Sequence, residues 1–418
     1  MIYIIGAGLA GLSAAVELTS RGLPVTVFEA SAQAGGRCRS YVDPVLEMTL
    51  DNGNHLVLSG NHATFAYLRK IGAEDHLVGP DEATLDFHDL RTSESWTIRP
   101  NPSALAWWLL SPKRRVLGTK TTDYLALVGL IAPPANRRID QVISCEGVLW
   151  DRLLEPFLLS ALNTEAKSAS ATLAGAVIRE SLALGGNAYR PRVAHPTLSA
   201  AFIDPALAYL AAQGADVRFG QPVRGLTFEG DRVSGLGFAD GDVTVTDADT
   251  VVLAAPAWIS QTLVPGLTAP NAFNAIVNGH FRFTPPPGLP PIVGVIGGTA
   301  QWIFSFDDRL SVTVSGADDL ADQDREALAR RFWADICAVH GLTAPLPPWR
   351  IVKERRATFA ATPEQNARRP KARTDWRNLI LAGDWTATGL PATIEGAIRS
   401  GGTAAKGVAD ARAANFKG

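Results

Sequence analysis

The sequence predicts an α/β fold built on a parallel sheet, and three observations at its start support this. Ile2–Ile5 is a short apolar run of the kind that forms a buried parallel strand. Glycines 6, 8 and 11 follow at once, and a helical pattern then runs from Leu9 to about Arg21. Val25–Phe28 reads as a second buried strand. Strand, glycine turn, helix and strand in this order predict a Rossmann-type βαβ unit.

Each residue of this unit has a physical task in binding a dinucleotide. Gly6 permits the tight turn, Gly8 lets the backbone approach a pyrophosphate, and Gly11 lets the helix pack on the strand. Leu9 and Ala10 open the helix, whose free N–H groups and dipole favour phosphate. Glu29, 18 residues beyond Gly11, is placed to accept the ribose hydroxyls, which disfavours the 2′-phosphate of NADP.

A second glycine pair distinguishes FAD from NAD. Gly35-Gly36-Arg37 follows Glu29 and Ala30. The complete run from Gly6 to Arg37 resembles the FAD-binding signature of the amine oxidase, phytoene desaturase and protoporphyrinogen oxidase superfamily. The resemblance implies that the glycine pair approaches FAD and that the arginine lies beside it.

Two later segments resemble the parts of that superfamily that return to the cofactor. The resemblance places the backbone of Val223 against the adenine. Gly383-Asp384 follows a strand at residues 378–382 and would contact the ribityl and pyrophosphate groups. The helix that begins near Ile394, with Ala397 in its first turn and Thr393 as N-cap, would point its N-terminus at the pyrimidine end of the flavin.

The superfamily pattern predicts two domains assembled from discontinuous segments. Residues 1–56, 206–258 and 373–418 would form the FAD-binding domain, of the type called GR2. Residues 57–205 and 259–372 are insertions that would form an α+β substrate-binding domain. The first insertion reads as largely helical, whereas the second mixes strands such as 310–314 with a helix over about 321–339.

Five further segments narrow the resemblance to the squalene-associated FAD-dependent desaturases of bacterial hopanoid clusters, the hydroxysqualene dehydroxylase family. They are residues 51–55, 154–164, 301–304, 356–363 and 381–397. The family implies a reductive dehydroxylation of hydroxysqualene to squalene. Reduced flavin would deliver hydride after the allylic hydroxyl departs as water. The chain has no second G-x-G-x-x-G, so the electron donor would be visiting NADPH or a reductase.

Four side chains are candidates for the acid that assists departure of water. His55 and Asp51 lie in a stretch that approaches the flavin in the superfamily, and Glu155 and Asn163 lie in the first insertion. For each of them a structural role, such as a hydrogen-bonded pair, a helix cap or a core hydrogen bond, is the alternative interpretation.

Composition excludes several partner classes and favours an apolar one. The net charge of −2 gives no reason to expect nucleic acid, and three distant cysteines suit neither a zinc site nor a disulfide framework. We expect no signal peptide, no spanning segment and no metal, and a cytoplasmic protein that is peripheral on the inner face of the membrane. Leu105–Leu110, with Trp107 and Trp108, precedes three basic residues and suits a membrane-surface patch; the alternative is that both tryptophans line the core.

Two competing functions remain open on sequence grounds. One is a carotenoid desaturase or amine oxidase of the same superfamily, although the apolar insertions favour a terpenoid substrate. The other is a protein of the Rab escort and GDP-dissociation-inhibitor type, which binds prenyl tails without flavin chemistry. Such a protein would not need the FAD motif and the Gly383-Asp384 segment together.

Overall fold

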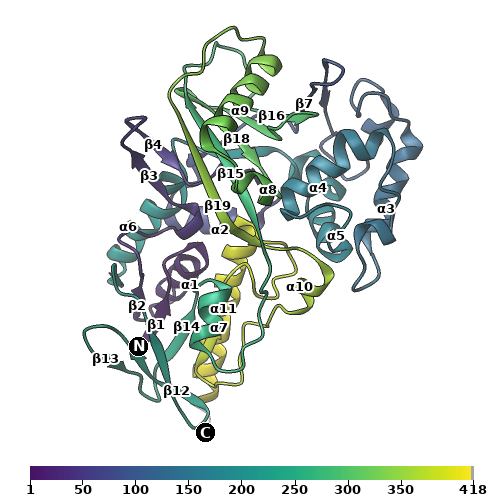
Figure 1. Ribbon diagram of the computed structural model, residues 1–418. Helices are drawn as coiled ribbons and strands as arrows, with labels where there is room; N and C mark the ends of the chain where they lie inside the picture. The colour runs from purple at the N-terminus through teal and green to yellow at the C-terminus, as the bar shows by residue number, and fades with distance from the viewer. Residues whose placement is uncertain (416–418) are drawn as a thin grey trace.

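A five-stranded parallel sheet forms the base of the protein in the computed structural model, which describes residues 1–415 (Figure 1). Its strands follow the order β10-β2-β1-β14-β20. Ile2 is in register with Val25 on one side and with Thr250 on the other. The strands are β1 (Ile2–Ile5), β2 (Val25–Phe28), β10 (Asp216–Arg218), β14 (Thr250–Leu253) and β20 (Leu379–Leu381). The predicted Rossmann-type α/β fold is therefore confirmed.

Two helices from opposite ends of the chain pack together beside this sheet. They are α1 (Leu9–Thr19) and α11 (Ile394–Asn415), which lie side by side in Figure 1. The approach is so close that a Cβ atom on Gly401 would lie 2.4 Å from the carbonyl oxygen of Ala10. The remaining elements around the sheet are α2 (His62–Ile71), α6 (Asp204–Ala212), α7 (Ala257–Leu263), β3 (Ser40–Asp43), β4 (Met48–Asp51), β11 (Gly225–Glu229), β12 (Arg232–Gly237) and β13 (Asp242–Thr244).

A seven-stranded mixed sheet forms the second layer and draws strands from both insertions. Its order is β19-β15-β18-β17-β16-β7-β8, and β16 pairs in parallel with β7 of the first insertion. The strands are β7 (Leu85–Asp89), β8 (Glu94–Ile98), β15 (Phe273–Arg282), β16 (Ile292–Ile296), β17 (Trp302–Ser305), β18 (Arg309–Val314) and β19 (Trp349–Phe359). The shared sheet was not predicted, and the exact domain boundaries remain a prediction.

The helix expected over about 321–339 is confirmed, but it begins four residues later and is preceded by a separate short helix. The short helix is α8 (Asp318–Ala321), and the expected helix is α9 (Arg325–His340). The break arises because Asp324 has extended backbone and its carboxylate accepts the N–H of Glu326 at 3.1 Å, which starts a new helix. The long face of α9 then packs on the sheet through Leu328, Phe332 and Ile336, which are fully buried.

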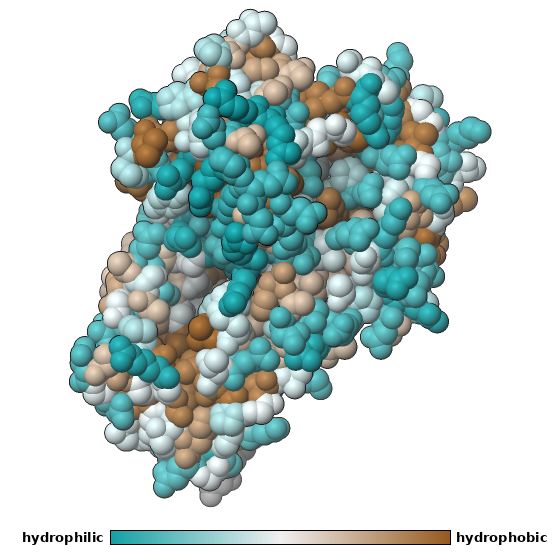
Figure 2. All heavy atoms as spheres, viewed as in Figure 1, coloured by the Kyte–Doolittle hydropathy of each residue, from teal (hydrophilic) through white to brown (hydrophobic). Residues whose placement is uncertain are grey.

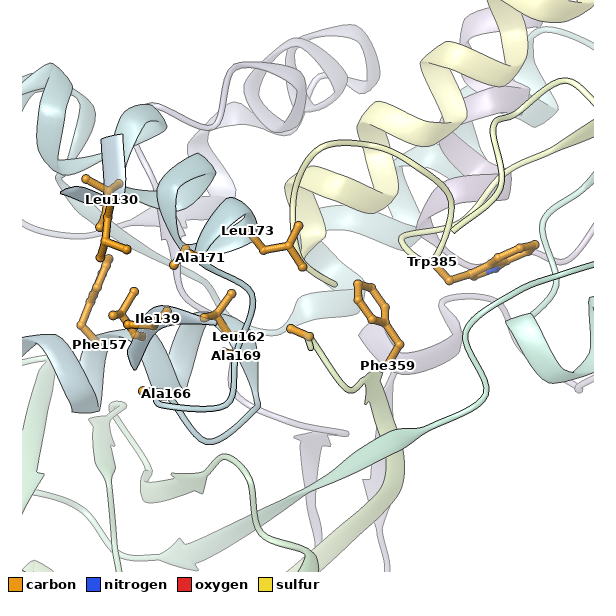
Figure 3. Packing of buried hydrophobic residues seen from close by; sticks show 14 of the residues in the cluster. Leu130, Ile139, Phe157, Leu162, Ala166, Ala169, Ala171, Leu173, Phe359 and Trp385 are labelled. Atoms are coloured by element: carbon orange, nitrogen blue, oxygen red, sulfur yellow. The ribbon is translucent and has the colours of Figure 1, made fainter. Parts of the chain in front are cut away.

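A helical lobe built from the first insertion stands beside the second sheet, at the right of Figure 1. Its core continues without a break into the rest of the molecule: Figure 3 shows Leu130 and Phe157 at one end and Phe359 and Trp385 at the other. Its main elements are η3 (Trp107–Leu110), η4 (Thr121–Leu125), α3 (Ala126–Ile131), η6 (Trp150–Leu154), α4 (Glu155–Leu162) and α5 (Ala171–Glu180). Among the described residues, no helix combines the length and apolar character needed to cross a bilayer.

Candidate cofactor and active site

The glycine turn between β1 and α1 lies at the carboxyl edge of the parallel sheet. The N–H of Gly6 donates to the carbonyl of Phe28 at 2.7 Å, which joins the turn to the end of β2. A Cβ atom on Gly11 would lie 1.9 Å from the backbone oxygen of Gly6. No larger residue fits at position 11 unless the helix moves away from the strand, as the sequence argument requires.

The second glycine pair closes on the first turn. Gly35 donates its N–H to the carbonyl of Ala7 at 2.8 Å, and a Cβ on Gly36 would be 3.6 Å from the Cα of Gly8. A Cβ on Gly8 itself would meet no atom within 4 Å. The two turns therefore face a hollow with backbone on its wall.

The first turn of α1 presents hydrogen-bond donors at this hollow. Within residues 1–415, the N–H groups of Leu9, Ala10 and Gly11 have no acceptor, and Gly8 caps the helix without a side-chain bond. Unpaired N–H groups at a helix N-terminus favour a phosphate group.

The carboxylate of Glu29 lies at the end of β2, directly before exposed Ala30. One of its oxygens accepts the N–H of Ala7 at 2.7 Å, and the other accepts the N–H and hydroxyl of Ser31. Glu29 thus stabilises the glycine turn in addition to its predicted contact with ribose. Val223 lies nearby in sequence after β10, and its backbone N–H and carbonyl have no partner in the described part of the chain. Both observations suit the predicted adenosine side.

The far C-terminal segment meets the N-terminal one through an ion pair. Arg37 donates from Nη2 to Oδ2 of Asp384 at 2.7 Å and from Nη1 to the carbonyl of Ala357. Asp384 is buried. Gly383, directly before it, has a φ of 145°, and a Cβ atom at this position would lie 2.3 Å from Nε1 of Trp385. The two motifs that the sequence places 347 residues apart therefore share one contact.

Two residues that support this junction were missed by sequence reasoning. Arg369 is buried and donates to the carbonyls of Asp384 and Thr386 and to the hydroxyl of Thr388. Burial lowers the pKa of Arg369 to about 10, which is still above neutral pH, and the side chain therefore remains a cation. Ser400 accepts the N–H of Gly383 at 2.8 Å. Arg369 lies in no recognisable motif, and Ser400 lies in the helix that begins at Ile394, where its residue type alone predicts no role.

The start of α11 has the predicted geometry. Thr393 caps the helix, since its hydroxyl accepts the N–H of Gly396 at 3.0 Å and its carbonyl accepts that of Ala397. Ile394 is buried. Glu395 takes a structural task, because it accepts the N–H groups of Ala63 and Thr64 at the start of α2. We call the two glycine turns, the first turn of α1 and the Arg37–Asp384 pair the cofactor cradle. The helix therefore begins at a fixed position relative to this cradle.

These groups fit FAD. Donors without partners at the start of α1, a glycine surface where a side chain would intrude, and a carboxylate–arginine pair between the two motifs are the features that a dinucleotide requires.

His55 is the catalytic candidate that lies near the cradle, where the charge of Arg37 acts on it. Desolvation, and then the positive charge of Arg37, lower the pKa of His55 to about 4. The imidazole is therefore neutral at pH 7. A neutral imidazole can donate one hydrogen bond from its N–H group, but it is not the protonated imidazolium that would act as a general acid.

Asp51 is committed to structural contacts. Its Oδ1 accepts the hydroxyl of Ser40 at 2.6 Å and the N–H of Leu198 at 2.9 Å, while Oδ2 lies 3.7 Å from Arg309. Desolvation raises its pKa. These contacts fasten the β3–β4 hairpin to the chain before α6.

Asn163 joins the helical lobe to the seven-stranded sheet. It ends α4 with a φ of 45°, donates to Thr358 at 2.9 Å and to the carbonyl of Asn274, and accepts the N–H of Gly316. Glu155 opens α4 and is half-buried; its backbone N–H donates to the carbonyl of Trp150, and its carboxylate has no hydrogen-bond partner among the described residues. Of the four candidates, Asp51 and Asn163 are thus held by structural hydrogen bonds, whereas His55 is acted on by the charge of Arg37.

Comparisons with known proteins agree with this site. The model of the flavin containing amine oxidoreductase family matches residues 9–409. The chain is 53% identical to a hydroxysqualene dehydroxylase of Rhodopseudomonas palustris and 50% identical to one of Zymomonas mobilis. The alignments cover 97% and 96% of this chain, and 97% of each relative. An oxidoreductase from Methanosarcina mazei shares the fold with a TM-score of 0.71 at 15% identity, covering 96% of this chain and 98% of that one.

FAD is thus the cofactor of this protein, which is an oxidoreductase. The chain belongs to the flavin containing amine oxidoreductase family and, within it, to the hydroxysqualene dehydroxylases.

Proposed function

We propose that the protein catalyses the FAD-dependent reductive dehydroxylation of hydroxysqualene to squalene. The observation that carries this is the identity of 50–53% along nearly the whole chain to three proteins named hydroxysqualene dehydroxylase. The desaturase alternative has weaker support, since a probable zeta-carotene desaturase is 26% identical over 63% of this chain.

The backbone of the cradle holds the cofactor in this proposal. The N–H groups of Leu9, Ala10 and Gly11 would bind the pyrophosphate of FAD. Arg37 and Asp384 would hold the middle part of FAD from two sides. The N-terminus of α11, capped by Thr393, would stabilise negative charge at the pyrimidine end. When bound and reduced, FAD supplies a hydride.

The substrate side must release water and keep other water out. The hydroxyl oxygen of the substrate would take up a proton drawn from solvent, the C–O bond would break with departure of water, and the allylic carbon would accept the hydride that reduced FAD supplies. His55, neutral beside Arg37, would orient the hydroxyl by donating a hydrogen bond. Phe359, whose ring lies against Arg369, and Trp385, directly after Asp384, are both buried and would form apolar walls for the isoprenoid chain.

Two partners complete the proposal. The protein needs a source of electrons, for which NADPH and a protein reductase are the candidate classes. Its long apolar substrate dissolves in lipid, so we also propose that it works as a cytoplasmic protein peripheral to the membrane.

Conversion of substrate tests the function directly. Purified protein with FAD, dithionite and hydroxysqualene should form squalene, detected by mass spectrometry. Oxidation of phytoene or of an amine, with no squalene formed, would contradict the proposal.

Substitution of His55 tests its role. His55→Ala should retain FAD and lose about a hundredfold in kcat, the lower end of the range for a single positioned proton-transfer group. His55→Gln should recover part of the rate. Because the pKa of His55 is about 4, the wild-type rate should show no histidine titration between pH 5.5 and 8. His62→Ala, at an exposed site on α2, is the matched control.

A further inference from the structure

The outer surface of the helical lobe is unusually apolar. Seven of the sixteen large apolar side chains that are exposed in the described residues lie within the 27 positions 105–131, and we call this segment the docking face. They are Leu105, Trp107, Leu110, Leu117, Leu125, Val128 and Ile131. Figure 2 shows brown, apolar atoms on this right-hand lobe between polar ones. Concentration on so short a segment separates this face from the scattered apolar residues of an ordinary surface.

The segment is apolar on two sides, and only the inner side is covered by protein. Trp108, Tyr124 and Leu130 point inward and are at most 8% exposed. Trp108 and Tyr124 pack ring to ring at 5.7 Å, which holds η3 against η4. Leu125, Val128 and Ile131 recur every third residue on the outer side of η4 and α3, with Leu125 68% and Val128 62% exposed. A helix that is apolar all round is stable only when both sides are buried.

The two adjacent tryptophans show the same division. Trp108 is 8% exposed, whereas Trp107 is 49% exposed and stacks under the guanidinium of Arg114 at 5.2 Å. The sequence alternatives were a membrane patch or a core lining for both tryptophans; the structure buries Trp108 in the core and leaves Trp107 exposed.

The charge of the docking face selects among its partners. Residues 105–131 contain four basic side chains and one acidic, whereas the whole chain carries −2. Lys113 and Lys120 are exposed, and Trp107 lies beside Arg114. Exposed Trp and Leu next to Lys and Arg complement an anionic lipid surface, where apolar groups enter the interface and cations meet headgroups.

The docking face is also continuous with the apolar core that reaches the cofactor. Trp108, Tyr124 and Leu130 belong to the same cluster as Phe359 and Trp385, the latter directly after Asp384. Figure 3 shows this succession from Leu130 to Trp385. One cluster of buried apolar residues therefore extends from beneath the docking face to Trp385.

We infer that the docking face seats the protein on the surface of an anionic bilayer, from which its apolar substrate enters. The second clause rests on the proposed function, whereas the first rests on exposure and charge alone. Insertion of η3 and the outer side of α3 would bury the seven apolar side chains while Lys113 and Lys120 meet lipid phosphates.

Vesicle flotation of the full-length holoenzyme tests the inference. Wild type should float with vesicles of phosphatidylcholine and phosphatidylglycerol and bind pure phosphatidylcholine more weakly. Trp107→Ser/Leu110→Ser should weaken binding to both by about tenfold or more, and Lys113→Ala/Lys120→Ala should remove most of the preference for the anionic lipid.

A matched pair of substitutions on another element controls for nonspecific adsorption of exposed apolar side chains to vesicles. Val42 and Val45, on and next to the β3–β4 hairpin, are 73% and 62% exposed, so Val42→Ser/Val45→Ser should float as wild type does. Equal flotation of wild type and the Trp107/Leu110 variant, or concentration-dependent dimerisation that this variant abolishes in place of vesicle binding, would overturn the inference. Turnover of hydroxysqualene in detergent should be unchanged in all variants; its absence in wild type would contradict the proposed function and leave the vesicle result standing.

Discussion

The cofactor cradle and the helical lobe are held together by different kinds of contact. In the cradle, contacts are made by backbone groups: the turn at Gly6, the N–H groups that open α1, and the loop at Gly35. In the lobe, contacts are made by side chains, such as the packing of Trp108 on Tyr124 and the hydrogen bonds of Asn163. Backbone contacts restrict which residue can stand at a position, whereas apolar packing accepts many residues of similar volume.

This contrast teaches that the two regions can fail separately. A side chain added to the cradle should remove the cofactor and leave the lobe folded. A side chain removed from the junction of lobe and sheet should loosen the lobe and leave the cofactor bound. The predictions below test this separation.

Gly11→Ala should have the largest effect. Its Cβ would lie 1.9 Å from the backbone oxygen of Gly6, so α1 must shift away from β1 and from the pyrophosphate. We expect FAD affinity to fall by about 5- to 150-fold, which corresponds to overpacking costs of about 1–3 kcal/mol, as measured by flavin absorbance per polypeptide. Gly402→Ala is the matched control, because its Cβ would meet no atom within 4 Å. Flavin content equal to wild type in Gly11→Ala would contradict the close approach.

Asn163→Ala should destabilise the junction between lobe and sheet. The change leaves the N–H of Gly316 and the carbonyl of Asn274 without their partner, at about 1–3 kcal/mol for each buried polar group. Asn136→Ala has the same left-handed backbone on the surface, so it should lose only about 1 kcal/mol. Urea unfolding with FAD absorbance as a second readout measures both, and loss of flavin before loss of the lobe would break the proposed separation.

Acid should destabilise the fold through His280, which is buried in β15. Desolvation and the charge of Arg309 lower the pKa of His280 in β15 to about 3, against about 6.5 in the unfolded chain. Because the folded pKa is depressed, the stabilisation is present above pH 6.5 and is lost as pH falls toward 3. Between pH 7 and pH 5 the free energy of unfolding should drop by about 2 kcal/mol from this residue.

Comparison of two variants isolates the contribution of His280 to the pH dependence of stability. His280→Gln should show a shallower fall of the urea midpoint between pH 7 and pH 5 than wild type does. His62→Gln, at an exposed position, should retain the wild-type slope. Parallel curves for wild type and His280→Gln would assign the acid sensitivity to other groups.

Short-range requirements explain what could be predicted along the chain. The strand at Ile2–Ile5, the helix from Leu9 and the strand at Val25–Phe28 were placed correctly because apolar period and glycine spacing act over a few residues. The N-cap at Thr393 was predicted for the same reason and is confirmed by its bond to Gly396. The helix expected over about 321–339 is present, but the cap at Asp324 moves its start to Arg325.

The catalytic candidates show where this reasoning ends. Residue type made His55, Asp51, Glu155 and Asn163 equivalent, but their roles depend on neighbours that are distant in sequence. Asp51 is held by Leu198 and Arg309, whereas Asn163 is held by Thr358 and Gly316. Only folding gives His55 a charged neighbour, and Arg369 its place beneath Asp384.

The sequence by itself determined the cofactor, because a glycine turn, an acid and a Gly-Asp segment must each satisfy local backbone geometry. Tertiary structure decided the rest: that Arg37 pairs with Asp384, that the two insertions share one sheet, and that Trp107 faces outward while Trp108 faces the core. The physical reason is that burial and ion pairing belong to sets of residues brought together from distant positions, and no window of sequence contains such a set.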